Sequence, residues 1–365
     1  MNETKKIKLL VLTPTLQCGG SERFVSLVCD HINTEKFAVC LVVVNNARPF
    51  YQLRNPAIEV VDLQLDRVLF SLSAIKTVVE KFKPDIIFST ANHLNLYLAI
   101  FKNRFSKQIK FIAREASIVS ISSRRAKMPL VYNWLIKKFY QRFHCIICQS
   151  QYMQHDLVTH YRIGAGKTVV IHNAVEEVLL PLTEQGKPGS EQPPTFITVA
   201  RLSQEKGIER LIHAVGLLSA PFTYHIIGDG IKRDELQKLI EELQLTEKVF
   251  LVGERTKPFA GMENADLFLF GSYYDGFPNV LLEAGAHGIP VIAFNVPGGI
   301  AEIISTENGI LVDDNDIIAF ATSIKKALEI NFNRRSIIAA TTKRFAIKQM
   351  IAEIENLFLS YSENK

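Results

Sequence analysis

Short apolar runs alternate with segments of helical period along almost the whole chain. The strand-like runs of the first half are 7–13, 38–44, 58–62, 85–89, 109–113, 144–148 and 168–171. Those of the second half are 195–200, 223–227, 248–252, 266–270, 289–294 and 309–312. Helices are predicted between them, among others at 21–32, 71–83, 206–218, 231–244, 278–287 and 316–329. Because apolar strands alternate with helices, the pattern predicts parallel sheets that helices cover on both faces.

One interruption divides this pattern into two domains, as the length of 365 residues also favours. Residues 181–194, PLTEQGKPGSEQPP, are rich in Pro, Gly and polar side chains. We predict a first α/β domain over 1–175, a linker over 176–194 and a second domain over 195–345. The last segment, 346–365, is expected to be a helix that packs back on the first domain. Two such domains leave a cleft between them, and ligands collect at the carboxyl ends of parallel strands.

Composition and charge narrow the class of protein. With 47% hydrophobic and 22% charged residues, a disordered or fibrous protein is excluded. Residues 1–175 carry 24 Lys and Arg against 11 Asp and Glu, so the remaining residues carry 18 against 26. The first half is therefore basic and the second acidic. No apolar run is long enough to span a bilayer, and the run at 7–12 is too short for a signal peptide.

The cysteines favour a reducing, cytoplasmic location. There are five, an odd number, and all lie in the first half. Cys145 and Cys148 form a C-x-x-C, but they lie in an apolar strand pattern and have no second pair to complete a zinc site. We interpret them as core residues.

Three segments carry candidate chemistry. Gly19 and Gly20 follow the first strand, where they could form either a phosphate-binding loop or a simple tight turn; Ser21 can cap the next helix. Arg201 ends a strand and Lys206 begins the next helix, so the two cations could clamp a diphosphate or merely be solvated. The third segment, YYDGFPNVLLEAG, places one carboxylate in a loop, at 275, and another about one turn into a helix, at 283.

These segments resemble, in order, the motifs of the family 4 retaining glycosyltransferases. The similar stretches are GGSERFVSL, VARLSQEKGIERLI, IIGDG at 226–230, DGFPNVLLEA, VPGGIAEII at 296–304 and NGILV at 308–312. The resemblance covers nearly the whole chain, and DGFPNVLLEA followed by VPGG is similar to the branch that builds bacterial surface polysaccharides and lipid-linked oligosaccharides. It implies the α/β GT-B fold, in which two Rossmann-like parallel-sheet domains face each other across a cleft.

The resemblance also implies roles for individual residues. Arg201 and Lys206 would neutralise the leaving diphosphate, with backbone contacts from Gly20. Glu283 would hold the ribose hydroxyls, and Asp275 would hold the donor sugar. The family has Glu where this chain has Asp275, which shortens the reach by one methylene. Further positions implied at the nucleotide sugar are Gly19, Gly228, Gly276, Phe277, Asn279, Val280 and Leu281. The family needs no metal or other cofactor, because fixed cations take the place of Mg²⁺.

Other residues have competing interpretations. Asp314-Asn315-Asp316 matches the D-x-D of metal-dependent glycosyltransferases, but it precedes a predicted helix, where Asp and Asn are ordinary turn and cap residues. His93 follows a strand and could face the acceptor or only begin a helix. Glu115, where relatives carry a His or Glu, is a second acceptor-side candidate, and its neighbour Arg114 could pair with an anionic acceptor or with Glu115.

A basic segment suggests a membrane surface as a partner. Residues 102–145 carry eleven Lys and Arg and one acid. Within them, the segment 127–145 carries an apolar stripe that Lys137, Lys138 and Arg142 flank. The stripe consists of Leu130, Val131, Trp134, Leu135 and Phe139. This is typical of a helix lying on an anionic bilayer, although such a stripe can also pack on a sheet. Nucleic acid is a competing polyanion, but the sequence has no recognised motif for reading it.

Together these features predict a cytoplasmic glycosyltransferase on the inner face of the cell membrane. It would move a hexose or N-acetylhexosamine from a nucleotide sugar, most simply a UDP-sugar, to a lipid-linked or polysaccharide acceptor. The alternatives are a sugar-nucleotide 2-epimerase of the same fold and a non-catalytic module that binds nucleotide sugars or polyanions.

Overall fold

The computed structural model describes residues 5–177 and 193–363. By their internal contacts these residues form two units, one of residues 5–173 with 347–363 and the other of the described residues between 174 and 346. The predicted linker lies mostly outside the described residues. The chain enters the second unit at Ala174 and leaves it at Ala346, where Val175 and Ala346 form an isolated parallel bridge.

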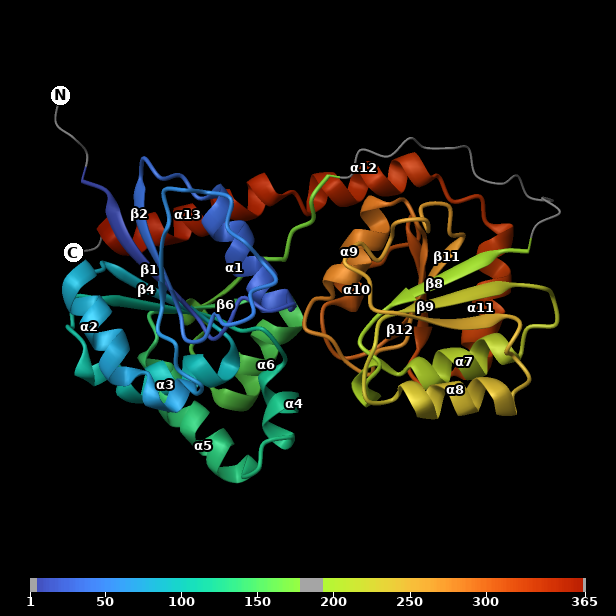
Figure 1. Cartoon of the computed structure of the whole chain (residues 1–365), viewed down its shortest axis with the longest axis horizontal. Coiled ribbons are helices and arrows are strands. Elements are labelled where there is room, and N and C mark those ends of the chain that lie inside the picture. Colours follow the sequence, from blue (N-terminus) through green and yellow to red (C-terminus); the bar gives the residue numbers. More distant parts are fainter. Residues whose placement is uncertain (1–4, 178–192, 364–365) are drawn as a thin grey trace. The chain divides into compact units, whose positions relative to one another are not determined.

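The first unit is built on a seven-stranded parallel sheet with the strand order β3-β2-β1-β4-β5-β6-β7. Its strands are β1 (Ile7–Thr13), β2 (Phe37–Val43), β3 (Glu59–Asp62), β4 (Ile86–Thr90), β5 (Lys110–Arg114), β6 (Cys145–Cys148) and β7 (Thr168–Val170). Its helices are α1 (Gly20–His31), α2 (Leu72–Phe82), α3 (Asn92–Phe101), α4 (Val119–Arg124), α5 (Pro129–Phe139), α6 (Gln151–Tyr161) and α13 (Ile347–Glu363). Figure 1 shows these helices around the strands.

Helix α13 packs on the first unit, although it is last in the sequence. The Phe358 ring lies against Phe37 of β2 and Phe88 of β4, with centroids 6.2 and 5.4 Å apart. The Glu355 carboxylate accepts a hydrogen bond from the backbone N–H of Asn33 at 2.7 Å. The apolar face of α13 therefore completes the core over β1, β2 and β4.

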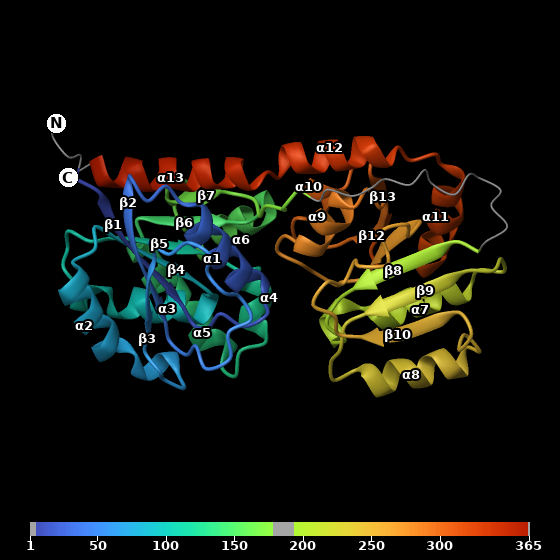
Figure 2. The same ribbon diagram turned by 45° about the horizontal axis from the view of Figure 1, so that its top comes forward.

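The second unit repeats the architecture with six parallel strands in the order β10-β9-β8-β11-β12-β13. The strands are β8 (Thr195–Val199), β9 (Thr223–Ile227), β10 (Val249–Gly253), β11 (Leu267–Phe270), β12 (Val291–Asn295) and β13 (Gly309–Asp313). The helices are α7 (Ile208–Gly216), α8 (Arg233–Glu242), α9 (Asn279–Ala286), α10 (Ile300–Ile303), α11 (Ile317–Glu329) and α12 (Arg334–Arg344). Figure 2 shows β8, β9 and β10 side by side above α8.

The sequence pattern located every strand of the two sheets to within about two residues, and the prediction of parallel sheets is confirmed. Two helices, predicted to begin at 206 and 231, each begin two residues later, at Ile208 and Arg233. Lys206 lies in a short 3₁₀ turn, Gln204–Lys206, and α7 begins only at Ile208. The reason is Gly207, whose φ of +55° belongs to the left-handed region and separates the turn from the helix.

In each sheet the strands are added first on one side of a central strand and then on the other, so the strand order has a switch point at a central pair of strands. In the first sheet this pair is β1 and β4, and in the second it is β8 and β11. In such sheets the loops that leave the two strands run to opposite faces and open a crevice at the carboxyl edge, where ligands bind. The fold therefore directs the search for a site to the loops after these four strands.

Candidate functional site

The loops after β8 and β11 bring together two of the predicted site residues. Nζ of Lys206 lies 2.8 Å from Oδ2 of Asp275. Both side chains are largely but not fully buried, with 25% and 20% of their surface exposed. The two residues are 69 positions apart in the sequence, and each follows one of the two strands at which the sheet order reverses. The ion pair thus marks the place where this topology favours ligand binding.

Two glycines allow these loops to approach each other. A Cβ on Gly207 would lie 2.0 Å from the carbonyl oxygen of Gly271, and a Cβ on Gly271 would lie 2.5 Å from that of Gly207. Any other residue type would push the loops apart. The backbone N–H of Tyr273 also donates to the carbonyl of Glu205 at 3.0 Å, which ties the turn carrying Lys206 to the segment leading to Asp275.

Arg201 lies just after the end of β8, beside the loop that follows β9. Its side chain is exposed. The next residue, Leu202, donates its N–H to the carbonyl of Asp229 at 2.9 Å. A Cβ on Gly228 would lie 1.9 Å from the carbonyl oxygen of Ala200, so only glycine fits there. The two loops form one layer of backbone at the carboxyl edge, which holds Arg201 and Gly228 next to each other.

Asp275 is fixed by a second backbone contact, with the loop after β12. Its N–H donates to the carbonyl of Pro297 at 3.1 Å, and its own carbonyl accepts from Gly299 at 3.2 Å. Gly298 lies between these contacts with a φ of +132°, and a Cβ there would lie 1.6 Å from the carbonyl oxygen of Asp275. The carbonyl of Gly276 also accepts from the N–H of Gly299, at 3.0 Å. The VPGG motif therefore supports the loop that carries Asp275.

Helix α9 begins directly after this loop and carries Glu283. Pro278 is its N-cap, not a residue of its first turn, and no side chain caps the helix. The N–H groups at the start of the helix, together with the helix dipole, favour an anion there. The Glu283 side chain is half-buried one turn further on.

Besides Glu283, four of the residues implied at the nucleotide sugar lie on α9 or within two residues of its start. The Phe277 ring is buried and packs edge-on against Phe345, and the Leu281 side chain is 1% exposed. These two positions can offer a ligand only backbone groups. Asn279 and Val280, in contrast, are partly exposed.

In the first unit, the glycine loop leads into α1. Gly19 is the N-cap in extended backbone, and Gly20 is the first residue of the helix. The expectation that Ser21 caps the helix is wrong, since no side chain does so. Instead, Glu22 occupies the loop: its carboxylate accepts from the Thr15 hydroxyl at 3.2 Å, and a Cβ on Gly19 would lie 2.3 Å from it.

His93 lies close to this loop, in the first turn of α3, which follows β4. Its side chain is exposed. Partial desolvation of the ring lowers the pKa of His93, and the negative charge of Glu22 opposes this shift. Ala91, two residues before His93, has a φ of +77°, a value that residues other than glycine rarely adopt. At the carboxyl edge of the first sheet, His93 and Glu22 thus lie in the helices that follow the two central strands, β4 and β1.

The second acceptor-side candidate, Glu115, requires a correction. It is fully buried, and its Oε1 accepts hydrogen bonds from Asn95 Nδ2 and the Tyr140 hydroxyl, both at 2.9 Å. Burial raises its pKa to about 7, against the lowering effect of these hydrogen bonds and of Arg114. A carboxyl group with no exposed surface cannot touch an acceptor in this conformation. Glu115 is a core residue here.

Arg114 is also fully buried and cannot pair with an external anion in this conformation. Its guanidinium carbon lies 3.8 Å from the centre of the Phe24 ring, and its NH2 group donates to Asn173 Oδ1 at 2.6 Å. The C-x-x-C cysteines are buried in β6, as expected of core residues. Burial raises the pKa of the Cys145 thiol to about 11 and that of Cys148 further, which keeps both protonated.

Two family models match the chain and together span most of it. "Glycosyltransferase Family 4" matches residues 18–178, and "Glycosyl transferases group 1" matches residues 183–344. The division between the two matches falls where the structure changes from one parallel sheet to the other. The chain belongs to the family 4 glycosyltransferases.

Three relatives show how far the similarity of this glycosyltransferase extends. An N-acetylgalactosamine-N,N'-diacetylbacillosaminyl-diphospho-undecaprenol 4-alpha-N-acetylgalactosaminyltransferase from Campylobacter jejuni is 26% identical over 88% of this chain and 90% of its own. The lipopolysaccharide outer core galactosyltransferase WaaB superposes with a TM-score of 0.76 at 19% identity over 97% and 99% of the two chains. HepE from Anabaena, solved in complex with UDP, gives 0.77 at 21% over 98% and 100%. The two structures confirm the GT-B fold.

Sequence reasoning missed one residue of the glycosyltransferase's second unit, Arg210 of α7. Its Nε donates to the Gly271 carbonyl at 2.7 Å, its NH2 group donates to the Ser272 carbonyl, and NH1 lies 2.7 Å from Asp314 Oδ1. In the sequence Arg210 looks like any surface cation on an amphipathic helix, and nothing local signals that it is 3% exposed.

Two residues of the D-x-D sequence have structural roles, and the helix cap is the one that the alternative interpretation expected. Asp314 is the counter-ion of Arg210. The side chain of Asp316 caps α11 by accepting from the N–H of Ala319 at 2.8 Å. Among the residues that the structure describes, no group of three or more His, Cys, Asp or Glu side chains could hold a metal ion, and no helix is long and apolar enough to cross a membrane.

Proposed function

We propose that this glycosyltransferase moves a hexose or an N-acetylhexosamine from a nucleotide sugar, most simply a UDP-sugar, to a lipid-linked or polysaccharide acceptor, with retention at the anomeric carbon. The observation that carries the proposal is the group of Lys206, Asp275 and the uncapped N-terminus of α9 at the switch point of the second sheet. These groups combine fixed positive potential for a diphosphate with a carboxylate for sugar hydroxyls.

The reaction needs a stabilised leaving group more than it needs a side-chain base. Lys206 and Arg201 would neutralise the diphosphate as the bond between the anomeric carbon and its phosphate oxygen breaks. The acceptor hydroxyl oxygen would bond to that carbon on the same face, and its proton would pass to the departing phosphate oxygen. Glu283 would hold the ribose hydroxyls and Asp275 the donor sugar. On this proposal the two cations supply the charge that a divalent metal supplies in other glycosyltransferases.

The comparisons support the choice of donor and acceptor class. The Campylobacter jejuni relative acts, by its name, on a diphospho-undecaprenol-linked sugar, and WaaB acts on the lipopolysaccharide outer core. Both acceptors are glycans on a lipid anchor. HepE binds UDP, which supports a uridine nucleotide as the carrier of the donor sugar. We propose that the first unit receives the acceptor near His93 and the glycine loop at 19–20.

A lipid-linked acceptor requires contact with a membrane, and the first unit has a surface suited to it. Four apolar side chains at the start of α5 are exposed to 60%, 85%, 44% and 55%: Met128, Leu130, Val131 and Trp134. We call them the apolar patch. Exposed cations flank it in the sequence: Arg124, Arg125, Lys127, Lys137 and Lys138. Within α5 itself, the side chain buried in the core is that of Ile136. We propose that the apolar patch inserts into the anionic inner face of the cell membrane.

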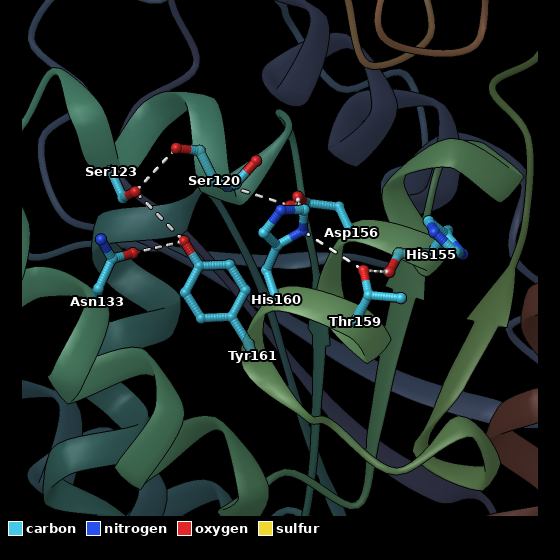
Figure 3. A network of polar contacts seen from close by, with 8 residues as sticks. All are labelled: Ser120, Ser123, Asn133, His155, Asp156, Thr159, His160 and Tyr161. Atoms are coloured by element: carbon cyan, nitrogen blue, oxygen red, sulfur yellow. Dashed lines mark hydrogen bonds and ion pairs between the residues drawn. The ribbon is translucent and has the colours of Figure 1, made fainter.

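The apolar patch is carried by a well-braced segment. Figure 3 shows polar contacts that join α4 and α5 to α6. The Tyr161 hydroxyl of α6 lies 2.7 Å from Asn133 Oδ1 of α5 and 3.2 Å from Ser123 Oγ of α4. Asp156 accepts from the Ser120 N–H at 3.0 Å and lies 3.1 Å from His160 Nδ1. These contacts hold the patch in place in the absence of a membrane.

Membrane binding can be measured by co-sedimentation with vesicles. We expect binding to phosphatidylglycerol vesicles and much weaker binding to phosphatidylcholine vesicles, since each cation near an anionic surface contributes about 1 kcal/mol. Leu130→Gln should weaken binding about tenfold or more, because burial of a leucine side chain contributes roughly 1.5–3 kcal/mol. The matched control is Ile231→Gln in the second unit, where the side chain is 92% exposed. Equal binding by both variants would refute the membrane proposal.

The donor is best identified by thermal stabilisation with a panel of nucleotides and nucleotide sugars. A true donor at one hundred times its dissociation constant stabilises the protein by about 2.7 kcal/mol. We expect UDP and UDP-sugars to raise Tm more than GDP or ADP compounds do. Incubation with the stabilising donor alone then separates the activities, since an epimerase would convert it without any acceptor and a transferase would not.

A further inference from the structure

Arg210 connects the two loops that carry Lys206 and Asp275. It projects from the first turn of α7, which begins two residues after Lys206. Its guanidinium donates to the carbonyls of Gly271 and Ser272, the two residues that follow β11. Asp275 lies three residues further along the same loop. The guanidinium therefore joins α7, which begins directly after the Lys206 turn, to the loop that carries Asp275.

The surroundings of Arg210 hold its guanidinium in one place. The Tyr273 ring centre lies 4.1 Å from the guanidinium carbon, and the Phe294 ring centre lies 3.9 Å from it. Asp314 supplies the counter-charge, and the Tyr273 hydroxyl donates to Glu209 at 2.9 Å. Planar guanidinium groups combine such stacking with hydrogen bonds in fixed directions, which a lysine cannot do.

We infer that Arg210 is a positioning residue, which sets the distance between Lys206 and Asp275 and thereby the geometry of the transfer step. The expected effect of Arg210 on turnover rests on the proposed function, whereas its expected effect on the ion pair does not. A charge-only role would need neither the two backbone carbonyls nor the two flanking rings. Displacement of a reacting group by about 1 Å can lower a rate about a hundredfold.

The same unit contains a matched control for a purely structural role. Arg334 of α12 is also buried, and it also donates to two backbone carbonyls, those of Glu263 and His287. Those carbonyls precede β11 and β12, so they lie at the amino edge of the sheet, opposite the candidate site. Arg210→Lys and Arg334→Lys thus make the same change at the two edges of one sheet.

Two measurements test the inference. The first is the kcat and KM of sugar transfer by wild type, Arg210→Lys and Arg334→Lys, with Tm as a measure of structural damage. We expect Arg210→Lys to lower kcat at least tenfold with KM for the donor within threefold. Arg334→Lys should lower Tm to a similar extent and leave kcat within twofold of wild type. A kcat unchanged in Arg210→Lys, or equally reduced in both variants, would overturn the inference.

The second measurement does not depend on activity. A double-mutant cycle with Lys206→Met and Asp275→Asn, followed by urea unfolding, gives the coupling between the two side chains. We expect the coupling in the Arg210→Lys background to be at most half of that in wild type, and to be unchanged in the Arg334→Lys background. Unchanged coupling in Arg210→Lys would refute the inference, whereas a wild type without transfer activity would refute only the proposed function.

Discussion

Replacement of Asp275 by asparagine should strengthen the binding of UDP. In the structure Oδ2 of Asp275 lies 2.8 Å from Nζ of Lys206, and both side chains retain only a quarter or less of their exposure. If Lys206 is to hold a diphosphate, the Asp275 carboxylate competes with the phosphate for the same ammonium group. Asp275→Asn keeps the size of the side chain and removes this competitor.

The magnitude follows from the geometry of the pair. A phosphate oxygen at hydrogen-bond distance from the same Nζ would lie roughly 5–6 Å from the Asp275 carboxylate. At that distance two unit charges repel each other by about 1.5 kcal/mol with an effective dielectric constant of about 40, and by about twice that with 20. Salt screening favours the lower value. We therefore expect UDP to bind about tenfold more tightly to Asp275→Asn than to wild type.

The assay is isothermal titration with UDP at low and moderate ionic strength. Asp234→Asn is the matched control, because it makes the same change at an exposed position on α8 of the same unit. The gain in affinity should be larger at low salt, and kcat for transfer should fall, since the carboxylate that would hold the sugar is gone. UDP affinity equal to or weaker than that of wild type would refute the competition between Asp275 and the diphosphate.

Three further predictions concern the supports of the site and the core. Gly298→Ala should lower both Tm and kcat, because its Cβ would lie 1.6 Å from the Asp275 carbonyl oxygen. The control Gly261→Ala, also at positive φ but with open space around the Cβ, should leave kcat unchanged. Equal kcat in the two variants would contradict this account. The pKa of Glu115 is about 7 in the folded protein and about 4.5 in the unfolded chain. The free energy of unfolding should therefore fall as pH rises between these values, by up to about 1.4 kcal/mol per pH unit. Urea unfolding at pH 5, 6 and 7 should show a weaker slope for Glu115→Gln, and an identical slope would count against a neutral buried carboxyl. Asp316→Ala should cost about 1 kcal/mol of stability through loss of the α11 cap and should not change kcat; loss of activity would instead indicate the metal site that D-x-D denotes elsewhere.

The sequence predicted the fold because its signals are local and repeated. Apolar runs such as 7–13 and 195–200 are short, are mainly apolar on both faces and alternate with helices, which favours parallel sheets over other arrangements. The C-terminal helix lies in the first unit, as Phe358 on Phe37 and Phe88 shows. Its partners are hundreds of residues away, and no local pattern specifies them.

The candidate site was predictable as residue types but not as an arrangement. Glycine-rich turns after strands indicated the loops, yet the contact of Lys206 with Asp275 depends on two glycines packed back to back, at 207 and 271. For Glu115, the residue type suggested a site residue and the arrangement showed that it is not one. A carboxylate at a strand end suggests a ligand, but here Asn95 and Tyr140 enclose it within the core. Arg210 carries no local signal, because a buried arginine and a solvated one look alike on a helix.

The most direct test of the account is sugar transfer by the purified protein. Wild type is incubated with a radiolabelled UDP-sugar and a polyprenyl-diphosphate-linked saccharide in phosphatidylglycerol vesicles, and the lipid fraction is analysed for the label. We predict a labelled lipid product with wild type and a rate at least a hundredfold lower with Lys206→Ala, which should still unfold in one cooperative thermal transition, in line with the loss of one charge-stabilising donor from an active site. An unaltered rate in Lys206→Ala would contradict the account.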